Sequence, residues 1–86
     1  MGIKSIETYI SAKDSVDIYA GRGLIELDVN DGYECVMCIT SYWAVKVFSQ
    51  VGNNAINVSQ SSNGQTITVT NLTDSDIKIT YRRFGV

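Results

Sequence analysis

Two carboxylates in this sequence are spaced so that they could do chemistry together. Glu26 and Asp28 stand two residues apart, so on a strand they share one face, and two acids flanking one bond are the pair that a glycosidase uses. Such catalysis also needs a deep pocket, which a chain of 86 residues seldom forms. We therefore expect these carboxylates to lie on a solvated polar face.

Two thiols form the second candidate for chemistry. Cys35 and Cys38 make a C-x-x-C motif, but on a strand an offset of three residues directs the two thiols to opposite faces, whereas redox motifs of this type lie at a helix N-terminus. A metal site would need further Cys or His ligands, and the sequence offers none. We expect two free thiols that pack against their neighbours, no metal and no cofactor.

The sequence contains no His. That absence removes the commonest general base and the usual partner of a Ser or Cys nucleophile, so it excludes triad chemistry. We predict that the protein is not an enzyme. A hydrolase built on paired carboxylates is the weakest of the three hypotheses considered.

Aromatic residues next to amides favour ligand binding instead, because exposed Tyr and Trp rings stack on sugars while amides bond the hydroxyls. Tyr19 and Tyr42 fall on the strand face opposite their apolar neighbours, which predicts exposure. Trp43 shares its face with Val45 and Val47, and burial in the core is the favoured prediction for it. The candidate ligand-binding residues are Tyr19, Tyr42, Trp43, Asn53 and Asn54.

Charge and hydropathy argue against two kinds of partner. The net charge is −2 and only Arg82 and Arg83 are adjacent cations, a pair that we interpret as a solubilising edge, so we predict no nucleic-acid binding. No apolar run approaches the roughly 20 residues that span a membrane, and the N-terminus lacks the order of a secretory signal. We predict no membrane insertion and no export signal.

Turn residues at short intervals divide the chain into segments rich in Val, Ile, Thr and Tyr, which suit strands. Strands are predicted near residues 3–10, 15–20, 23–29, 33–41, 43–51, 55–60, 64–70 and 76–84. The fold class predicted is all-β: a compact two-layer sandwich or jelly-roll-like domain of about eight short antiparallel strands, forming one domain over residues 1–86.

Segment 35–39 breaks the alternation of the other strands and carries apolar side chains on both faces. The second face could be covered by another subunit or by a long loop, and the sequence leaves both open. Subunit pairing predicts a homo-oligomer, with a trimer favoured. The candidate interface residues are Val36, Met37, Ile39, Ile79, Tyr81 and Phe84.

The stretch from Gly32 to Tyr81 resembles a known class of module. It opens on Gly32-Tyr33, has Ser41-Tyr42-Trp43 at its centre and the turn Asn63-Gly64, and closes on the Thr-rich hairpin of residues 67–81. In this it resembles the small β-sandwich modules of bacteriophage tail-fibre, baseplate and related virion proteins.

The resemblance implies a virion structural or host-receptor-binding module that assembles as a trimer and contacts a host-surface saccharide or another virion subunit. It implies a location in the virion or in the cytoplasm of an infected bacterial host. Those modules usually end a long fibre chain, whereas this sequence begins at Met1. The alternative is therefore a small phage-encoded effector or inhibitor that binds a host protein or a small ligand.

Overall fold

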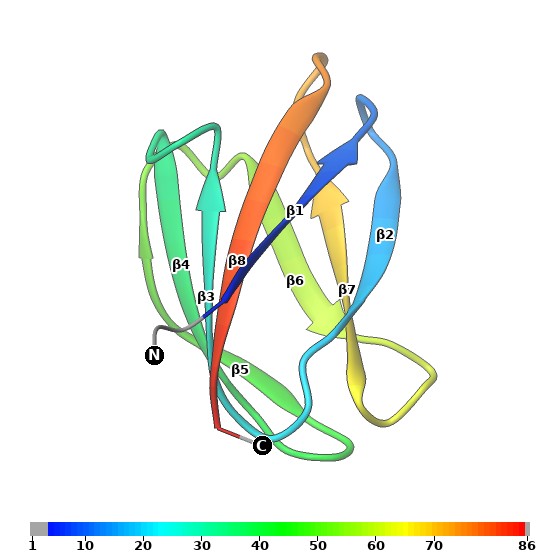
Figure 1. Cartoon of the computed structure of the whole chain (residues 1–86). Helices are drawn as coiled ribbons and strands as arrows, with labels where there is room; N and C mark the ends of the chain where they lie inside the picture. Colours follow the sequence, from blue (N-terminus) through cyan, green and yellow to red (C-terminus); the bar gives the residue numbers. More distant parts are fainter. Residues whose placement is uncertain (1–3, 86) are drawn as a thin grey trace.

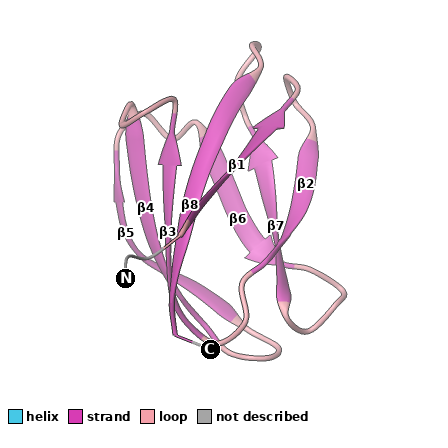
Figure 2. Ribbon diagram, in the orientation of Figure 1, coloured by secondary structure: helices cyan, strands magenta, loops and turns pink. Residues whose placement is uncertain are grey.

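The computed structural model describes residues 4–85 and consists of two antiparallel sheets packed face to face (Figures 1 and 2). The larger sheet has the order β1 (Ser5–Ile10), β8 (Ile77–Gly85), β3 (Gly23–Val29), β4 (Glu34–Thr40) and β5 (Val45–Val51). The smaller has the order β2 (Ser15–Tyr19), β7 (Thr66–Asn71) and β6 (Ile56–Gln60). The predicted all-β sandwich of eight strands is confirmed.

Each predicted strand is present, with ends that agree to within two residues; residue 3, where the first was predicted to begin, lies outside the described residues. The strands could be predicted because apolar and polar side chains alternate along them. Ile25 and Leu27 of β3 are fully buried between the sheets, while Glu26 between them lies on the outer face. The same alternation in β7 and β8 buries Ile67, Val69, Ile77 and Ile79. Each large apolar side chain so buried contributes about 1.5–3 kcal/mol.

Asn30, Asp31 and Gly32, three residues typical of turns, form the connection between β3 and β4. All three residues have positive φ angles, +48°, +58° and +104°, which Asn, Asp and above all Gly tolerate. The amide of Tyr33 closes the turn by donating to the carbonyl of Val29 at 2.8 Å. This segment is a hairpin connection, as its sequence predicts.

Strand β4 lies between β3 and β5, and its two faces have different surroundings. Val36 and Cys38 are fully buried against the smaller sheet, whereas Ile39 is 51% exposed on the outer face of the larger sheet. One alternative left open by the sequence was that a loop covers the second face of segment 35–39. This alternative is wrong for Ile39, because no loop buries its side chain. The smaller sheet covers one face of the strand, and the outer side of Ile39 stays open to solvent.

Successive strands run in opposite directions, so the connections alternate between two ends of the sandwich (Figure 1). Segments 11–14, 30–33, 52–55 and 72–76 lie at one end, uppermost in Figure 1. Segments 20–22, 41–44 and 61–65 lie at the other end, together with the start of β1 and the end of β8. No helix able to cross a membrane occurs in residues 4–85.

Candidate functional site

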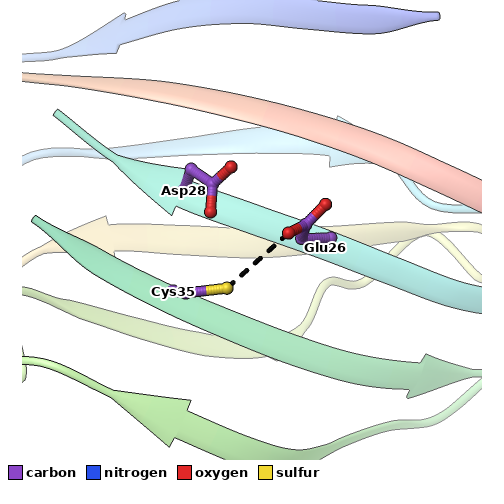
Figure 3. Close-up of side chains that lie close together, drawn as sticks. All are labelled: Glu26, Asp28 and Cys35. Carbon is purple, nitrogen blue, oxygen red and sulfur yellow. Dashed lines mark hydrogen bonds between the residues drawn. The ribbon is translucent and has the colours of Figure 1, made fainter. Parts of the chain in front are cut away.

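The two predicted acids lie beside one of the thiols on the outer face of the larger sheet (Figure 3). One ligand atom each of Glu26, Asp28 and Cys35 falls within 4.8 Å of the other two. Register places them there, because Asp28 on β3 is paired with Cys35 on β4. The Cys35 thiol donates a 3.7 Å hydrogen bond to Oε2 of Glu26.

Arg82 of β8 forms ion pairs with both carboxylates of this cluster. Its Nη1 donates to Oε1 of Glu26 at 3.0 Å and to Oδ2 of Asp28 at 3.3 Å, so one guanidinium holds both carboxylates. Burial, with Asp28 and then Glu26 alongside, raises the pKa of the Cys35 thiol to about 11. Near neutral pH the thiol is therefore protonated, which makes it a weak nucleophile. The cluster is best explained as an ion-paired patch that joins three strands.

The two thiols face opposite sides of β4, as their spacing predicts. Cys38 is fully buried in the core, and this burial raises its pKa to about 11. Both cysteines are free. Both cysteines act as packing residues in this structure.

Three candidate ligand-binding residues belong to strand ends and connections at one end of the sandwich, the lower end in Figure 1. Tyr19 ends β2, and its hydroxyl donates a 3.0 Å hydrogen bond to Oε1 of Gln65 in segment 61–65. Tyr42 and Trp43 lie in segment 41–44 at the same end. Both tyrosines are exposed, as predicted: Tyr19 lies on the outer face of β2, whereas Tyr42 is exposed because it lies in a turn, outside the strand alternation. We call Tyr19, Arg22, Tyr42, Trp43, Gln65 and Arg83 the aromatic end.

Trp43 corrects the sequence prediction, because its side chain is 71% exposed instead of buried. Alternation does not reach it: β5 begins at Val45, and Trp43 sits in a tight turn closed by the amide of Ser41 donating to the carbonyl of Ala44. The indole lies against Gly64, where an added Cβ would come within 2.9 Å of its Cε2 and Cζ2 atoms. The ring is thus supported by backbone on one side while most of its surface faces solvent.

Each tyrosine of the aromatic end carries a stacked guanidinium. The Cζ atom of Arg83 lies 4.6 Å from the ring centroid of Tyr19, and that of Arg22 lies 4.8 Å from the centroid of Tyr42. These are cation–π distances, worth about 0.5–1 kcal/mol each at exposed sites. They fix the positions of two arginines that would otherwise be free to move on the surface.

Asn53 and Asn54 do not belong to this site, which corrects the predicted set. Strand β5 runs from segment 41–44 to the segment that contains them, and its seven residues span roughly 20 Å. The two asparagines lie at the opposite end. There the amide of Asn53 donates to the buried carboxylate of Glu34 at 3.1 Å, as does the amide of Ala55 at 2.7 Å, so this loop is held by a structural contact.

Charge is distributed unequally between the two ends. Lys13, Lys78 and Arg82 all form salt bridges with carboxylates. The other four cations of the sequence, Lys4, Arg22, Lys46 and Arg83, form no salt bridge within residues 4–85 and their side chains donate no hydrogen bond there. All four lie at or next to the aromatic end: Lys4 directly precedes β1, Arg22 directly precedes β3, Lys46 is near the start of β5 and Arg83 is near the end of β8.

The predicted interface residues separate into two groups. Val36 and Ile79 are fully buried in the core and Tyr81 is 9% exposed on the same inner face, so their assignment to an intersubunit surface is corrected. Met37, Ile39 and Phe84 lie on the outer face of the larger sheet. Leu24, which the sequence prediction omitted, is paired with both Ile39 and Phe84 and completes an apolar row. We call Leu24, Met37, Ile39 and Phe84 the outer patch.

Sequence reasoning missed the arginines of the aromatic end. Arg83 was interpreted together with Arg82 as a solubilising edge, yet adjacent strand residues face opposite ways. Arg82 pairs with carboxylates and Arg83 stacks on Tyr19. Arg22 lies between two glycines in the short connection from β2 to β3, a context that gives no local indication of its aromatic partner.

Comparison with known protein families, curated proteins and solved structures finds no match for this chain.

Proposed function

We propose that the protein is a non-enzymatic binding module that recognises a saccharide through the aromatic end. The observation that carries this proposal is the exposed Trp43 ring, which rests against Gly64 and presents most of its surface to solvent. An indole held in this way offers a stacking platform at low cost in conformational entropy. The Gln65 amide, already bonded to Tyr19, supplies polar atoms of the type that bind sugar hydroxyls.

The resemblance to bacteriophage virion modules supports a setting for this activity. We propose a virion structural or host-receptor-binding module in which the saccharide is carried on the host surface. A binding site formed by loops at one end of a rigid sandwich suits that role, because loops can vary while the sheets position them.

A glycan array with the purified protein tests saccharide binding. Trp43→Ala removes the platform and should weaken binding of any positive glycan at least about tenfold, since both stacking and apolar burial are lost. Tyr33→Ala is the matched control, because Tyr33 is an aromatic residue that is 57% exposed at the opposite end. Binding to no glycan, or equal losses in both variants, would overturn the proposal.

We further propose that the chain self-associates through the outer patch, with a trimer favoured. Leu24, Ile39 and Phe84 form a contiguous apolar row across β8, β3 and β4. Because they are 36–51% exposed, each gains only a part of the about 1.5–3 kcal/mol of complete burial if a second copy covers it. Exposed apolar surface of this kind is common at protein interfaces. In sedimentation experiments the wild type should be an oligomer, whereas Ile39→Asp should be a folded monomer. A wild-type protein that is monomeric at micromolar concentration would exclude this proposal.

The alternative function is a small phage-encoded effector or inhibitor that binds a host protein or a small ligand. The outer patch would suit a host protein as well as a second copy of this chain. Capture of one host protein from a bacterial lysate by wild type but not by Ile39→Asp, with no glycan bound, would favour this alternative.

A further inference from the structure

The aromatic end is cationic and its loops contain no acid. Segments 19–22, 41–44, 61–65 and 83–85 include no Asp or Glu. Arg22 and Arg83 lie within the end, and Lys4 and Lys46 adjoin it. The opposite end carries most of the acidic loop residues, including Asp14, Asp31, Asp74 and Asp76. A chain of net charge −2 thus keeps one positive end, which attracts anions.

Stacking leaves the hydrogen-bonding capacity of the two arginines unused. A cation–π contact uses the charge of the guanidinium and does not consume its five N–H donors. Arg83 at 4.6 Å from Tyr19 and Arg22 at 4.8 Å from Tyr42 have this contact. Their side chains donate no hydrogen bond within residues 4–85. Both are therefore positioned donors of the geometry that binds a carboxylate with two parallel hydrogen bonds.

A hollow adjoins one of these arginines. Lys4, Ile6, Tyr81 and Arg83 line a depression of about 200 Å³ between β1 and β8. It is smaller than the roughly 300–1,000 Å³ of sites that enclose a whole small molecule, so it suits one substituent of a larger ligand. Two cations beside the apolar surface of Ile6 and Tyr81 match a carboxylate attached to a ring, because the cations bind the carboxylate while the ring covers apolar surface.

We propose that the ligand of the aromatic end is an acidic saccharide. Its carboxylate binds Arg83 and Lys4 in the hollow, and another ring of the same oligosaccharide stacks on Trp43. A series of contacts links the two subsites: Arg83 contacts Tyr19, Tyr19 bonds to Gln65, and the adjacent Gly64 supports Trp43. This inference rests on the proposed function and adds to it the class of sugar that is recognised.

The features of the aromatic end favour a saccharide over a nucleic acid. Nucleic-acid binding requires cations that follow a phosphate backbone over several nucleotides. Here the cations without a salt bridge lie at or next to one end, and the outer face next to it carries the acids Glu26 and Asp28, paired with Arg82. A local anion site and a single open indole at the same end fit one acidic unit and another ring of a short oligosaccharide.

Calorimetric titration at low ionic strength with three probes tests the inference. Oligogalacturonate supplies carboxylates, dextran sulfate supplies sulfates, and dextran oligosaccharides are neutral. We expect oligogalacturonate to bind at least about tenfold more tightly than dextran, because one hydrogen bond to a charged group contributes at least the about 1.4 kcal/mol that corresponds to tenfold. This preference should decrease with added salt.

Two variants with the same change in charge locate the effect. Arg83→Gln should weaken oligogalacturonate binding about tenfold or more and weaken dextran binding much less, so that the preference for oligogalacturonate is largely lost. Lys13→Gln, at the opposite end and paired with Asp74, should change neither. Thermal unfolding by circular dichroism establishes that both variants are folded.

The outcomes separate the inference from the proposed function. Equal affinity for oligogalacturonate and dextran, with both lost in Trp43→Ala, would leave the saccharide site standing and overturn its acidic specificity. A preference for dextran sulfate over oligogalacturonate would overturn the carboxylate assignment, and tighter binding of a short single-stranded DNA than of any saccharide would overturn the ligand class. Binding to no saccharide at all would end both proposals.

Discussion

The indole of Trp43 lies directly against Gly64, so that a Cβ atom added at Gly64 would come within 2.9 Å of the ring and within 2.8 Å of the carbonyl oxygen of Tyr42. This close approach joins the segment between β4 and β5 to the segment between β6 and β7. Because these strands belong to different sheets, the contact closes the sandwich at the aromatic end and positions the proposed sugar platform.

Gly64→Ala should displace Trp43. The carbonyl of Tyr42 is backbone and cannot move independently, so the two segments must separate or the indole must swing away. Trp43 is the one Trp in the sequence, so its fluorescence reports on this contact alone. We expect a shifted emission maximum and easier quenching by acrylamide. Ser62→Ala in the same loop is the control, and identical spectra for Gly64→Ala and wild type would show that the contact does not hold the ring.

Val36→Asp and Ile39→Asp should have opposite consequences although they lie on one strand. Val36 is fully buried between the sheets and Ile39 is half exposed on the outer face. A carboxylate in the core costs several kcal/mol, a large part of the total stability of a small domain, so Val36→Asp should unfold. Ile39→Asp should cost about 1 kcal/mol or less. Circular dichroism distinguishes them, and a folded Val36→Asp variant would contradict the assignment of faces.

Glu34→Ala should destabilise the fold through the loop between β5 and β6. The buried carboxylate accepts hydrogen bonds from the amides of Asn53 and Ala55, and a buried amide left without an acceptor costs about 1–3 kcal/mol. Urea denaturation measures the loss. Glu7→Ala is the control, because Glu7 is an exposed partner of Lys78 at 3.9 Å, where about 0–1 kcal/mol is expected. Equal losses in the two variants would mean that Glu34 does not hold this loop.

The thiol of Cys35 should react slowly below its raised pKa of about 11. Alkylation by iodoacetamide, mapped by mass spectrometry, should accelerate up to that pH and not level off near 9. Asp28→Asn removes a carboxylate that disfavours the thiolate, so it should lower the pKa and speed the reaction at pH 9. Asp31→Asn, in the turn, is the control. If Asp28→Asn has no effect on the rate, the contact between these side chains does not influence the thiol.

The buried thiol of Cys38 should make the stability of the fold depend on pH in the alkaline range. The pKa of the buried Cys38 is raised from 9.0 to about 11, so the folded protein retains the proton while the unfolded chain loses it. This stabilisation is complete below pH 9 and is lost as the pH rises from about 9 to about 11. Urea denaturation should show a smaller decline over this range in Cys38→Ala than in wild type. Parallel declines would show that Cys38 does not carry the dependence.

The alternation of side chains along the sequence determined most of the fold. In β3, Ile25 and Leu27 alternate with Glu26 and Asp28, and a pleated strand can bury only one of these faces. The offset of three residues placed Cys35 and Cys38 on opposite faces for the same reason. Turn residues such as Asn30 to Gly32 marked the strand ends, because they tolerate backbone angles that other residues avoid. These relations are local, so the sequence contains them.

The candidate site was decided by the tertiary structure. Trp43 follows β4 by a few residues and lies in a turn. Because side chains in a turn do not alternate between two faces, the sequence pattern could not predict its exposure. Its support at Gly64, and the stacking of Arg83 on Tyr19, join segments far apart in the sequence. Asn53 follows Trp43 by ten residues in the sequence yet lies a full strand length away. Which loops meet depends on strand order and direction, and these follow from packing of the two sheets as a whole, which no local pattern of residues encodes.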